Sequence, residues 1–349
     1  MVDFIIFQGY ILINIQKNHF FAGVIMKKIL VAGGAGYIGS ACTEYLLDKG
    51  YEVTVLDALL TGHLDAVDPR ANFFEADLAD REKVIAFCKK EQFDAVMHFA
   101  AFSLVGESMQ NPSKYFRNNL SNAINLADAA VESGVQSFVF SSTAATFGEP
   151  ETIPIDEMSR QNPINPYGES KLCFEKVLNW YSKIYGLKYA ALRYFNAAGA
   201  TEFHGEDHRP ESHLIPLILQ TVAGKREKLM LYGDDYDTPD GSCIRDYIHI
   251  LDLAQAHEKA LYAPESGHYN LGTGNGLSVK EIIAAAEKVT GKSVNFEIAP
   301  RRHGDPPRII ACSDRAKKVL NWHPEHESAL EIIESAWLWM QKFPNGYAK

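Results

Sequence analysis

Tyr167 and Lys171 are the residues whose types and spacing most directly suggest chemistry, because they stand four positions apart in the segment NPYGESK at residues 165–171. We expect this segment to open a helix that runs to about Tyr185, so that both side chains share one helix face. A phenol has a reference pKa of about 10, and a tyrosine that removes protons at neutral pH therefore needs positive charge beside it. Lys171 can provide that charge. The spacing alone is also common in surface pairs, so the prediction of proton transfer depends on the surrounding motifs.

Thr143 places a hydroxyl group at the carboxyl end of an expected strand. It closes the run FVFSST at residues 138–143, which is typical of a buried strand. Ligands of doubly wound sheets bind outside the carboxyl ends of the strands, and there Thr143 can hydrogen-bond a substrate oxygen. Thr143, Tyr167 and Lys171 together predict a catalytic set that handles a proton.

A glycine-rich turn supplies the expected binding site for a dinucleotide. The run ILVAGGAGYIG at residues 29–39 has the pattern of a strand, a tight turn with Gly33, Gly36 and Gly39, and the start of a helix. Glycines let the backbone approach a pyrophosphate, and the helix N-terminus supplies amide donors and the positive end of its dipole. A glycine turn with no ligand is the alternative, but the strand and helix context favours a dinucleotide.

Asp57 points to NAD as the dinucleotide. It ends the expected strand 53–57 and follows Gly39 by 18 positions. A carboxylate at that place can accept hydrogen bonds from the adenosine ribose hydroxyls and would repel a 2′-phosphate. The sequence therefore favours NAD over NADP.

The elements that must position these residues alternate between strands and helices. This alternation predicts βαβ units and a parallel sheet, hence an α/β protein with a Rossmann-type doubly wound sheet. After about Asn196 the connections become longer and richer in Gly, Pro and Asp, which indicates a smaller mixed α/β substrate domain. We expect an NAD-binding domain at 26–195 and a substrate-binding domain at 196–349, to which the resemblance described below assigns a UDP sugar. The expected strands are 29–32, 52–56, 95–98 and 137–141, and the expected helices are 40–49, 81–91, 115–133, 279–290 and 328–341.

Composition narrows the class of protein. The chain has 349 residues and a formal net charge of −10, which argues against a nucleic-acid partner because such a partner usually leaves a basic footprint. Its five cysteines are widely spaced and form no CxxC pair, so we expect reduced thiols in a cytoplasmic protein and no zinc framework or other metal site. The first 25 residues carry an interrupted apolar stretch that is too short to span a membrane. We expect them to be an extension outside the fold, from an upstream start site, with the fold beginning at Met26.

The motifs together resemble the extended short-chain dehydrogenase/reductase family, and the likeness spans Lys27 to Lys349. It rests on residues 32–39, MHFAA at 97–101, Asn118-Asn119, FSSTAATFG at 140–148, 166–171, LRYFNAAG at 192–199, RDYI at 245–248 and APRRHGD at 299–305.

The resemblance implies an NAD-dependent enzyme that inverts C4 of a UDP sugar, interconverting UDP-glucose and UDP-galactose through a 4-keto intermediate. Thr143, Tyr167 and Lys171 would form the catalytic set and would also touch the cofactor. The rest of the implied cofactor site is Gly33, Gly36, Tyr37, Ile38, Gly39, Asp57, Asp77, Leu78, Phe99, Ala100, Ala101, Asn118 and Phe195. The implied substrate contacts, besides Thr143 and Tyr167, are Asn196, Leu214, Tyr232, Arg245, Arg302 and Asp305, whereas Arg301 and Lys225 are expected to be surface charges.

The details of the pattern separate the possible activities. Dehydratases of this family place an Asp-Glu pair after the active-site threonine, but here Thr143 is followed by Ala144-Ala145, which favours epimerisation. Ile309 stands where the family limits the group at C2 of the sugar, and its intermediate bulk leaves N-acetylated, pentose and uronate sugars open. A non-catalytic NAD sensor is a further alternative, although such proteins usually lose the tyrosine or the lysine.

Three positions depart from the family pattern, and one helix face needs a partner. Ser103 replaces a lysine that can help to hold NAD, Ala58 replaces an asparagine after the acid, and His213 replaces an asparagine near UDP. The helix from Tyr167 carries two apolar stripes, of which only one can face the sheet. The resemblance implies that the other packs against a second copy in a homodimer.

Overall fold

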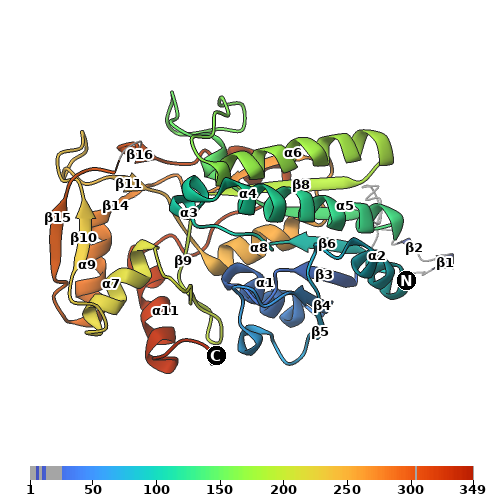
Figure 1. Ribbon diagram of the computed structural model, residues 1–349, viewed down its shortest axis with the longest axis horizontal. Helices are drawn as coiled ribbons and strands as arrows, with labels where there is room; N and C mark the ends of the chain where they lie inside the picture. Colours follow the sequence, from blue (N-terminus) through green and yellow to red (C-terminus); the bar gives the residue numbers. More distant parts are fainter. Residues whose placement is uncertain (1–4, 8–9, 13–25, 303–304, 349) are drawn as a thin grey trace.

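The protein is built around a parallel sheet of seven strands in the order β13-β8-β7-β6-β3-β4-β5 (Figure 1). The computed structural model describes residues 5–7, 10–12, 26–302 and 305–348. Strand order reverses between β3 and β6, as in a doubly wound dinucleotide-binding sheet, so the expected fold class is confirmed. The strands are β3 (Lys28–Ala32), β4 (Glu52–Asp57), β5 (Asn72–Glu75), β6 (Ala95–His98), β7 (Ser137–Thr143), β8 (Lys188–Tyr194) and β13 (Gly267–Leu271).

Apolar residues alternate along the central strands and divide the core into two layers. On β3, Ile29 and Val31 face helices α1 (Tyr37–Asp48) and α8 (Ile250–Ala260), while Leu30 faces the opposite layer. Strands that are apolar on both faces are expected in a parallel sheet covered by helices on both sides. The opposite layer is formed by α2 (Arg81–Glu91), α5 (Ala123–Glu132) and α6 (Pro166–Tyr185).

Most expected elements of the first half are present, with shifted boundaries. The helix after the glycine turn begins at Tyr37 rather than at residue 40, because Gly36 acts as its N-cap. The helix expected at 115–133 is divided into α4 (Pro112–Tyr115), a π-helical segment (Phe116–Asn122) and α5. A short helix α3 (Val105–Gln110) precedes them.

The second unit has its own core and lies at one end of the sheet (Figure 1). Its helices α7 (Leu214–Val222), α9 (Val279–Thr290) and α11 (Ala329–Lys342) pack together around apolar side chains. Its strands are β10 (Leu229–Tyr232), which pairs in parallel with β15 (Phe296–Ala299), and β11 (Ile244–Arg245), which lies between β14 (Leu277–Ser278) and β16 (Arg308–Ile309). Two further strands, β9 (Asn196–Ala198) and β12 (Tyr247–His249), pair in parallel, and α10 (Asp314–Val319) packs beside β13.

The two units are not consecutive blocks of sequence. Strand β13 pairs in parallel with β8, and α8 packs on α1, although both come from the range 196–349 expected for the substrate domain. Adding β13 pairs the open edge of β8 and extends the buried sheet, which is why this segment returns to the first unit. The expected boundary at residue 195 stays a prediction, although α8 and β13 pack with the first unit.

The N-terminal extension remains a prediction. Strands β1 (Ile5–Phe7) and β2 (Tyr10–Leu12) pair with each other in an antiparallel sheet of two strands, and the rest of residues 1–25 lies outside the described residues. Among the described helices, none is both long and apolar enough to cross a membrane.

A buried ion pair anchors α6 to the sheet. Glu175 on α6 accepts two hydrogen bonds from Arg193 on β8, at 2.9 and 2.6 Å, and a third from the Ser142 hydroxyl at 2.5 Å. The side chains of Glu175 and Arg193 are only 1% and 2% exposed. The carboxylate lies one helical turn after Lys171, so this pair fixes the part of α6 that carries the expected catalytic residues.

We predict that Arg193→Met lowers the free energy of unfolding by about 3–5 kcal/mol, because it leaves the Glu175 carboxylate buried without its partner. Urea denaturation measures this change. The double variant Glu175→Leu/Arg193→Met should recover most of the loss, since it removes both charges. Lys27→Met is the matched control, because Lys27 pairs with Glu52 at 70% and 57% exposure and should change stability little. Equal destabilisation in the single and double variants would contradict a charge effect.

Candidate active site

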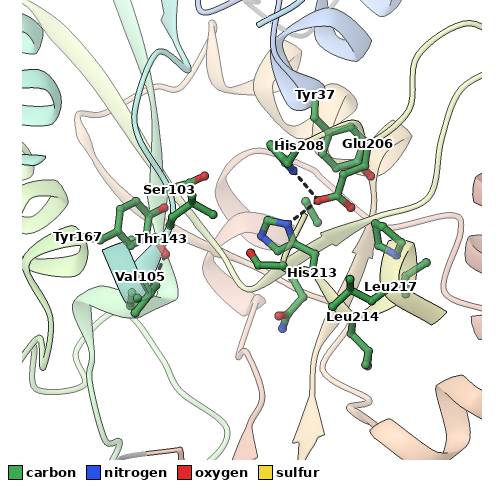
Figure 2. A pocket seen from close by; sticks show the side chains of 18 of the residues that line it. Tyr37, Ser103, Val105, Thr143, Tyr167, Glu206, His208, His213, Leu214 and Leu217 are labelled. Atoms are coloured by element: carbon green, nitrogen blue, oxygen red, sulfur yellow. Dashed lines mark hydrogen bonds and ion pairs between the residues drawn. The ribbon is translucent and has the colours of Figure 1, made fainter. Parts of the chain in front are cut away.

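A cavity of about 1370 Å³ lies between the two units and brings most of the expected site residues together. It runs from the glycine-rich turn, past the end of β7 and the start of α6, to β10, β11 and β16 of the second unit. Figure 2 shows Thr143 and Tyr167 on one side of it and Leu214 on the other. The expected residues that line it are Gly33, Gly36, Tyr37, Ile38, Gly39, Phe99, Ala101, Thr143, Tyr167, Lys171, Phe195, Asn196, Leu214, Tyr232, Arg245, Arg302 and Asp305.

Nearby backbone atoms leave no room for a side chain at two positions of the glycine turn, whereas a third position has free space. Gly33 has φ +86°, and a Cβ there would lie 2.3 Å from the Ala100 nitrogen. A Cβ on Gly39 would lie 2.2 Å from the Gly33 oxygen, so both positions require glycine for the turn to close. Gly36 differs, because its nearest neighbour would be the Gly33 oxygen at 3.4 Å. Glycine at position 36 leaves free space beside an α1 N-terminus that has no side-chain cap, which fits a bound pyrophosphate.

Asp57 is tied to the same turn. Its carboxylate accepts hydrogen bonds from the backbone nitrogens of Ala35 at 3.0 Å and Leu59 at 2.8 Å. Burial raises the pKa of this carboxyl, and those two backbone donors act in the opposite direction. Asp57 does not line the cavity itself. Its carboxylate therefore holds the turn through the Ala35 backbone from a position outside the cavity lining.

Four other expected cofactor residues also lie outside the cavity lining: Asp77, Leu78, Ala100 and Asn118. Asp77 is exposed and accepts a hydrogen bond from the Ala79 nitrogen at 2.8 Å, while Leu78 is buried in the core beside α2. Ala100 donates its N–H to the Ala32 oxygen at 3.0 Å, and Asn118 donates to Asn119 at 3.1 Å. Their roles at the cofactor stay predictions.

The Tyr37 side chain links the turn to the second half of the chain. Its ring is buried, and its hydroxyl donates to the Gly199 oxygen at 2.6 Å, just after β9. Burial, followed by the nearby Glu206 carboxylate, raises the pKa of Tyr37 well above its usual value, so the phenol keeps its proton. Only the backbone of Tyr37 is therefore free to meet a pyrophosphate.

Thr143, Tyr167 and Lys171 converge where β7 meets α6. Asn165 caps α6 by accepting a hydrogen bond from Gly168 at 2.8 Å, and Pro166 occupies the first turn, so the helix begins directly before Tyr167. Thr143 is the last residue of β7, and its side chain lies beside that of Tyr167 in the cavity (Figure 2). Lys171 is buried, and its ammonium donates to the Ser141 oxygen at 2.8 Å.

Burial governs the protonation of this set. It raises the pKa of Tyr167, and the neighbouring Thr143 side chain acts in the opposite direction. Burial lowers the pKa of Lys171 to about 7, against the Glu175 carboxylate, which raises it. Lys171 donates to backbone rather than to the phenol, so the chain alone leaves Tyr167 protonated near neutral pH. Forming the phenolate requires an additional positive charge in the cavity.

The expected substrate residues lie on the wall opposite Tyr167. Arg245 and Asp305 form an ion pair whose side chains are 12% and 27% exposed. The Arg302 guanidinium stacks over the Tyr232 ring at 4.0 Å. Two arginines, an aromatic ring and a carboxylate so arranged can bind a diphosphate, a base and a ribose.

The remaining expected substrate residues lie where the chain enters the second unit. Asn196 at the start of β9 donates its side-chain amide to the Asp246 oxygen at 3.0 Å, and Leu214 is the first residue of α7. Ile309 on β16 stands directly beside Arg245 in the ladder and lines the cavity. The expectation that Arg301 and Lys225 are surface charges is confirmed: Arg301 pairs with Asp235 at 2.6 Å, and both basic residues are exposed.

Sequence reasoning missed two residues that hold this geometry. Asp246, between β11 and β12, is fully buried and accepts hydrogen bonds from Thr273 and Gly274 in the loop after β13 and from Ala311, two residues after β16. The sequence signal that could have indicated a buried Asp246 was its place in RDYI, between Arg245 and the apolar residues Tyr247 and Ile248. Asn119, in the π-helical segment, bonds the Phe102 backbone at 2.9 Å and Ser170 at 3.3 Å, holding α6 to the cavity rim.

The three residues that differ from the family pattern, Ser103, Ala58 and His213, have different surroundings. Ser103 is exposed and lines the cavity, whereas Ala58 is half-buried behind Asp57 and does not line it. The His213 ring pairs with Glu206 at 2.7 Å and Glu211 at 3.1 Å.

Comparisons of the sequence and of the structure with known proteins all point to one family. The NAD dependent epimerase/dehydratase family matches residues 29–272, a range that ends just after β13. The chain is 52% identical over 327 residues to a UDP-glucose 4-epimerase of Streptococcus mutans, covering 91% of this chain and 98% of that protein. A crystal structure of UDP-glucose 4-epimerase matches with a TM-score of 0.91 at 52% identity, over 93% of this chain and 100% of the other. The UDP-glucose 4-epimerase of Bifidobacterium longum in complex with NAD⁺ and UDP matches with a TM-score of 0.86 at 35% identity, over 92% and 100%.

We predict that Gly36→Ala leaves the stability of the nucleotide-free chain within about 1 kcal/mol, because the structure has room for the added Cβ. The same Cβ should narrow the open space at the helix N-terminus and weaken dinucleotide binding about tenfold or more, equivalent to about 1.4 kcal/mol. Thermal denaturation and the NAD content of the purified chain measure the two effects. Gly39→Ala is the contrasting variant, since its Cβ would clash with the Gly33 backbone and should destabilise the nucleotide-free chain itself. Full NAD content in Gly36→Ala would contradict the assignment.

Proposed function

The chain belongs to the NAD dependent epimerase/dehydratase family, and on that premise we propose that its cavity is the active site in which UDP-glucose and UDP-galactose are interconverted by inversion at C4. Its activity is that of a UDP-glucose 4-epimerase. One observation carries the assignment to this cavity: Tyr167, which lies beside Thr143 and one turn from Lys171, lines the same cavity as Arg245 and Arg302. A proton acceptor and a diphosphate-binding wall then share one space.

The cofactor is NAD, and the chain's own residues fit it. The open position at Gly36, the uncapped start of α1 and the carboxylate of Asp57 together suit a pyrophosphate and a ribose without a 2′-phosphate. We assign the nicotinamide end to the space beside Phe99, Lys171 and Phe195, which line the cavity. When bound, NAD supplies an oxidised ring that accepts a hydride from C4 of the sugar and returns it.

Tyr167 is the proton acceptor in this proposal. Its phenolate oxygen accepts the proton of the sugar 4-hydroxyl, and the Thr143 hydroxyl donates a hydrogen bond to that sugar oxygen. Burial raises the pKa of Tyr167, so the phenolate forms only when positive charge stands beside it. Lys171 adds to that charge when protonated, and its bond to the Ser141 oxygen holds it within reach of the site. The reverse transfer returns the proton to the inverted hydroxyl.

The second unit holds the UDP group while the sugar turns. Arg245 and Arg302 neutralise the diphosphate, Tyr232 stacks on the base, and Asp305 accepts hydrogen bonds from the ribose. Because these contacts go to UDP, the keto sugar is held only through its diphosphate link and can present its other face to the same hydride donor. The cavity excludes bulk water from the intermediate when UDP fills its open side.

Epimerisation is favoured over the alternatives. The turn after Thr143, Ala144–Thr146, brings two alanines and no carboxylate to the site, so it supplies no acid or base for removing water from the keto sugar. Tyr167 and Lys171 are both in place, which argues against a non-catalytic NAD sensor. The similar proteins are UDP-glucose 4-epimerases, and this favours UDP-glucose over other UDP sugars as the main substrate.

The outer face of α6 supports a homodimer. Phe174 and Leu178 are buried against the sheet, whereas Trp180 and Ile184 are 60% and 64% exposed on the other stripe. We expect this stripe to pack against a second copy, because such apolar side chains rarely face water together. A monomeric mass in light scattering at working concentration would refute the dimer. The cysteines are free thiols in the described residues, which fits our proposal of a cytoplasmic enzyme.

We predict that Tyr167→Phe lowers kcat for UDP-galactose by about 10²- to 10⁴-fold, since it removes the proton acceptor but keeps the ring. The assay follows UDP-glucose formation with no NAD added, and the NAD content of the variant should stay near that of the parent chain. Tyr185→Phe is the control, because Tyr185 lies on the same helix but is 59% exposed and outside the cavity lining. Unchanged turnover in Tyr167→Phe would remove Tyr167 from the mechanism.

A further inference from the structure

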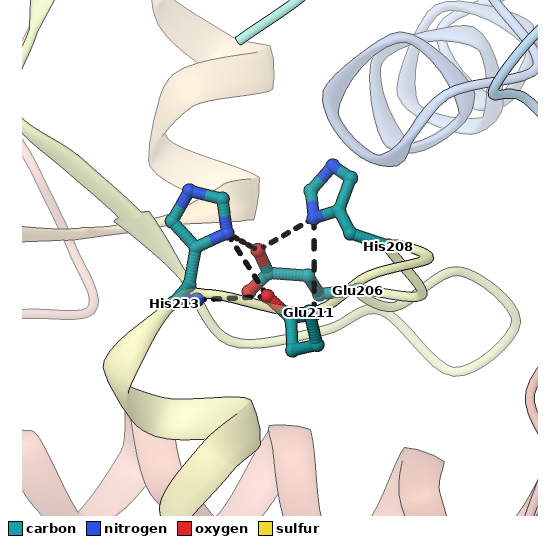
Figure 3. Close-up of side chains that lie close together, drawn as sticks. All are labelled: Glu206, His208, Glu211 and His213. Atoms are coloured by element: carbon teal, nitrogen blue, oxygen red, sulfur yellow. Dashed lines mark hydrogen bonds and ion pairs between the residues drawn. The ribbon is translucent and has the colours of Figure 1, made fainter. Parts of the chain in front are cut away.

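Four side chains of one loop converge at the cavity, three of them in its lining, and the proposed reaction does not use them. They are Glu206, His208, Glu211 and His213, which lie between β9 and α7 in the pattern E-x-H-x-x-E-x-H (Figure 3). One atom from each, a carboxylate oxygen or a ring nitrogen, lies within 4.8 Å of all the others.

The distances inside the cluster suit a metal ion. The Nδ1 atom of His213 lies 2.7 Å from Glu206 and 3.1 Å from Glu211, and that of His208 lies 3.0 and 3.8 Å from the same carboxylates. In a tetrahedral zinc site with bonds of about 2.0–2.2 Å, neighbouring ligand atoms are about 3.3–3.6 Å apart. The observed distances bracket that range, so small shifts would place all four around one ion.

Hydrogen bonding alone explains this arrangement less well. A ring nitrogen carries at most one N–H, which can align with only one acceptor. Yet the Nδ1 atom of His213 faces two carboxylates at hydrogen-bonding distance, and that of His208 also points between them. A cation at the centre would satisfy all four atoms at once.

Charge and burial point the same way. The carboxylates of Glu206 and Glu211 are only 8% and 6% exposed, so both need cationic neighbours, and in the chain alone the rings of His208 and His213 take that place. A divalent ion would neutralise both while the histidines bind as neutral ligands. Two imidazole nitrogens with two carboxylates are a ligand set typical of Zn²⁺ and neighbouring transition metals, rather than of Mg²⁺ or Ca²⁺.

The loop is held by bonds of its own backbone and by contacts with residues outside the cluster, so the ligands are partly oriented beforehand. Glu211 accepts hydrogen bonds from the backbone nitrogens of Ser212 at 2.7 Å and His213 at 2.8 Å. Arg209 binds the Tyr347 oxygen at 2.8 Å, and His63 bonds the Asp207 backbone oxygen at 2.9 Å. Such outer contacts fix the direction of a ligand and strengthen metal binding.

We propose that Glu206, His208, Glu211 and His213 bind one divalent transition-metal ion, with Zn²⁺ as the best match. The ion would clamp the loop that leads from β9 into α7. That loop lines the cavity, and His213 directly precedes Leu214 (Figure 2). The site is structural, because its ligands all come from the protein and it lies apart from Tyr167.

The test uses the full chain with its NAD, stripped of metal by a chelator, desalted and then supplied with Co²⁺ or Zn²⁺ alone. We expect about one ion per chain to remain after gel filtration, measured by elemental mass spectrometry, and the intense visible bands of tetrahedral Co²⁺, which Zn²⁺ then abolishes. We also expect Zn²⁺ to raise Tm, since an ion that binds only the folded chain stabilises it. Absence of a retained ion, or only the weak bands of octahedral Co²⁺, would overturn the proposal.

Variants separate this site from adventitious histidine binding. His208→Gln/His213→Gln should weaken Co²⁺ binding by more than the about 10- to 100-fold that loss of an outer contact costs. His323→Gln is the matched control, because His323 is exposed and outside the cluster, and it should bind like the parent chain. Glu211→Gln is a second variant with nearly unchanged shape, in case the double variant does not fold. Binding that survives in both variants, or that is lost in His323→Gln, would refute the assignment.

Discussion

The active site depends on how α6 is held against the sheet by buried charge. Lys171 and Glu175 lie one turn apart on the inner face of this helix, and both are buried. The first donates to the Ser141 backbone on β7, and the second pairs with Arg193 on β8. Charged groups are costly to bury without partners, so the helix cannot slide or rotate without losing these contacts. The position of Tyr167 relative to Thr143 follows from that constraint.

A second buried carboxylate performs a similar task for the substrate wall. Asp246 has no exposed surface and gathers backbone donors from the segments after β13 and β16, while its own backbone oxygen accepts from Asn196. This places Arg245, its neighbour in sequence, at the cavity. The two walls are therefore each fixed by an acid that does not touch the substrate. Fixed walls with a movable sugar between them are what inversion by rotation requires.

Much of the fold could be predicted because the signals were local. The glycine turn, the strand ending at Asp57 and the start of α6 after Asn165 each depend on a few adjacent residues, and all are present. The return of β13 to the sheet could not be predicted in this way, because a short run such as Gly267–Leu271 does not reveal which strand it will pair with. The split of residues 112–132 by a π-helical segment was likewise missed, since apolar spacing does not distinguish it from a continuous helix.

By itself, the sequence determined the fold class and, through the family resemblance, the reaction, and it predicted the dinucleotide turn and the proton-handling residues. Each of these rests on residue types at fixed spacing, which a single stretch of chain carries. Only the tertiary structure decided which side chains share a space: the wall that faces Tyr167, the protonation of Lys171 and Tyr167, and the meeting of Glu206, His208, Glu211 and His213. Burial and the pairing of charges are properties of three-dimensional neighbours, and no spacing along the chain states them.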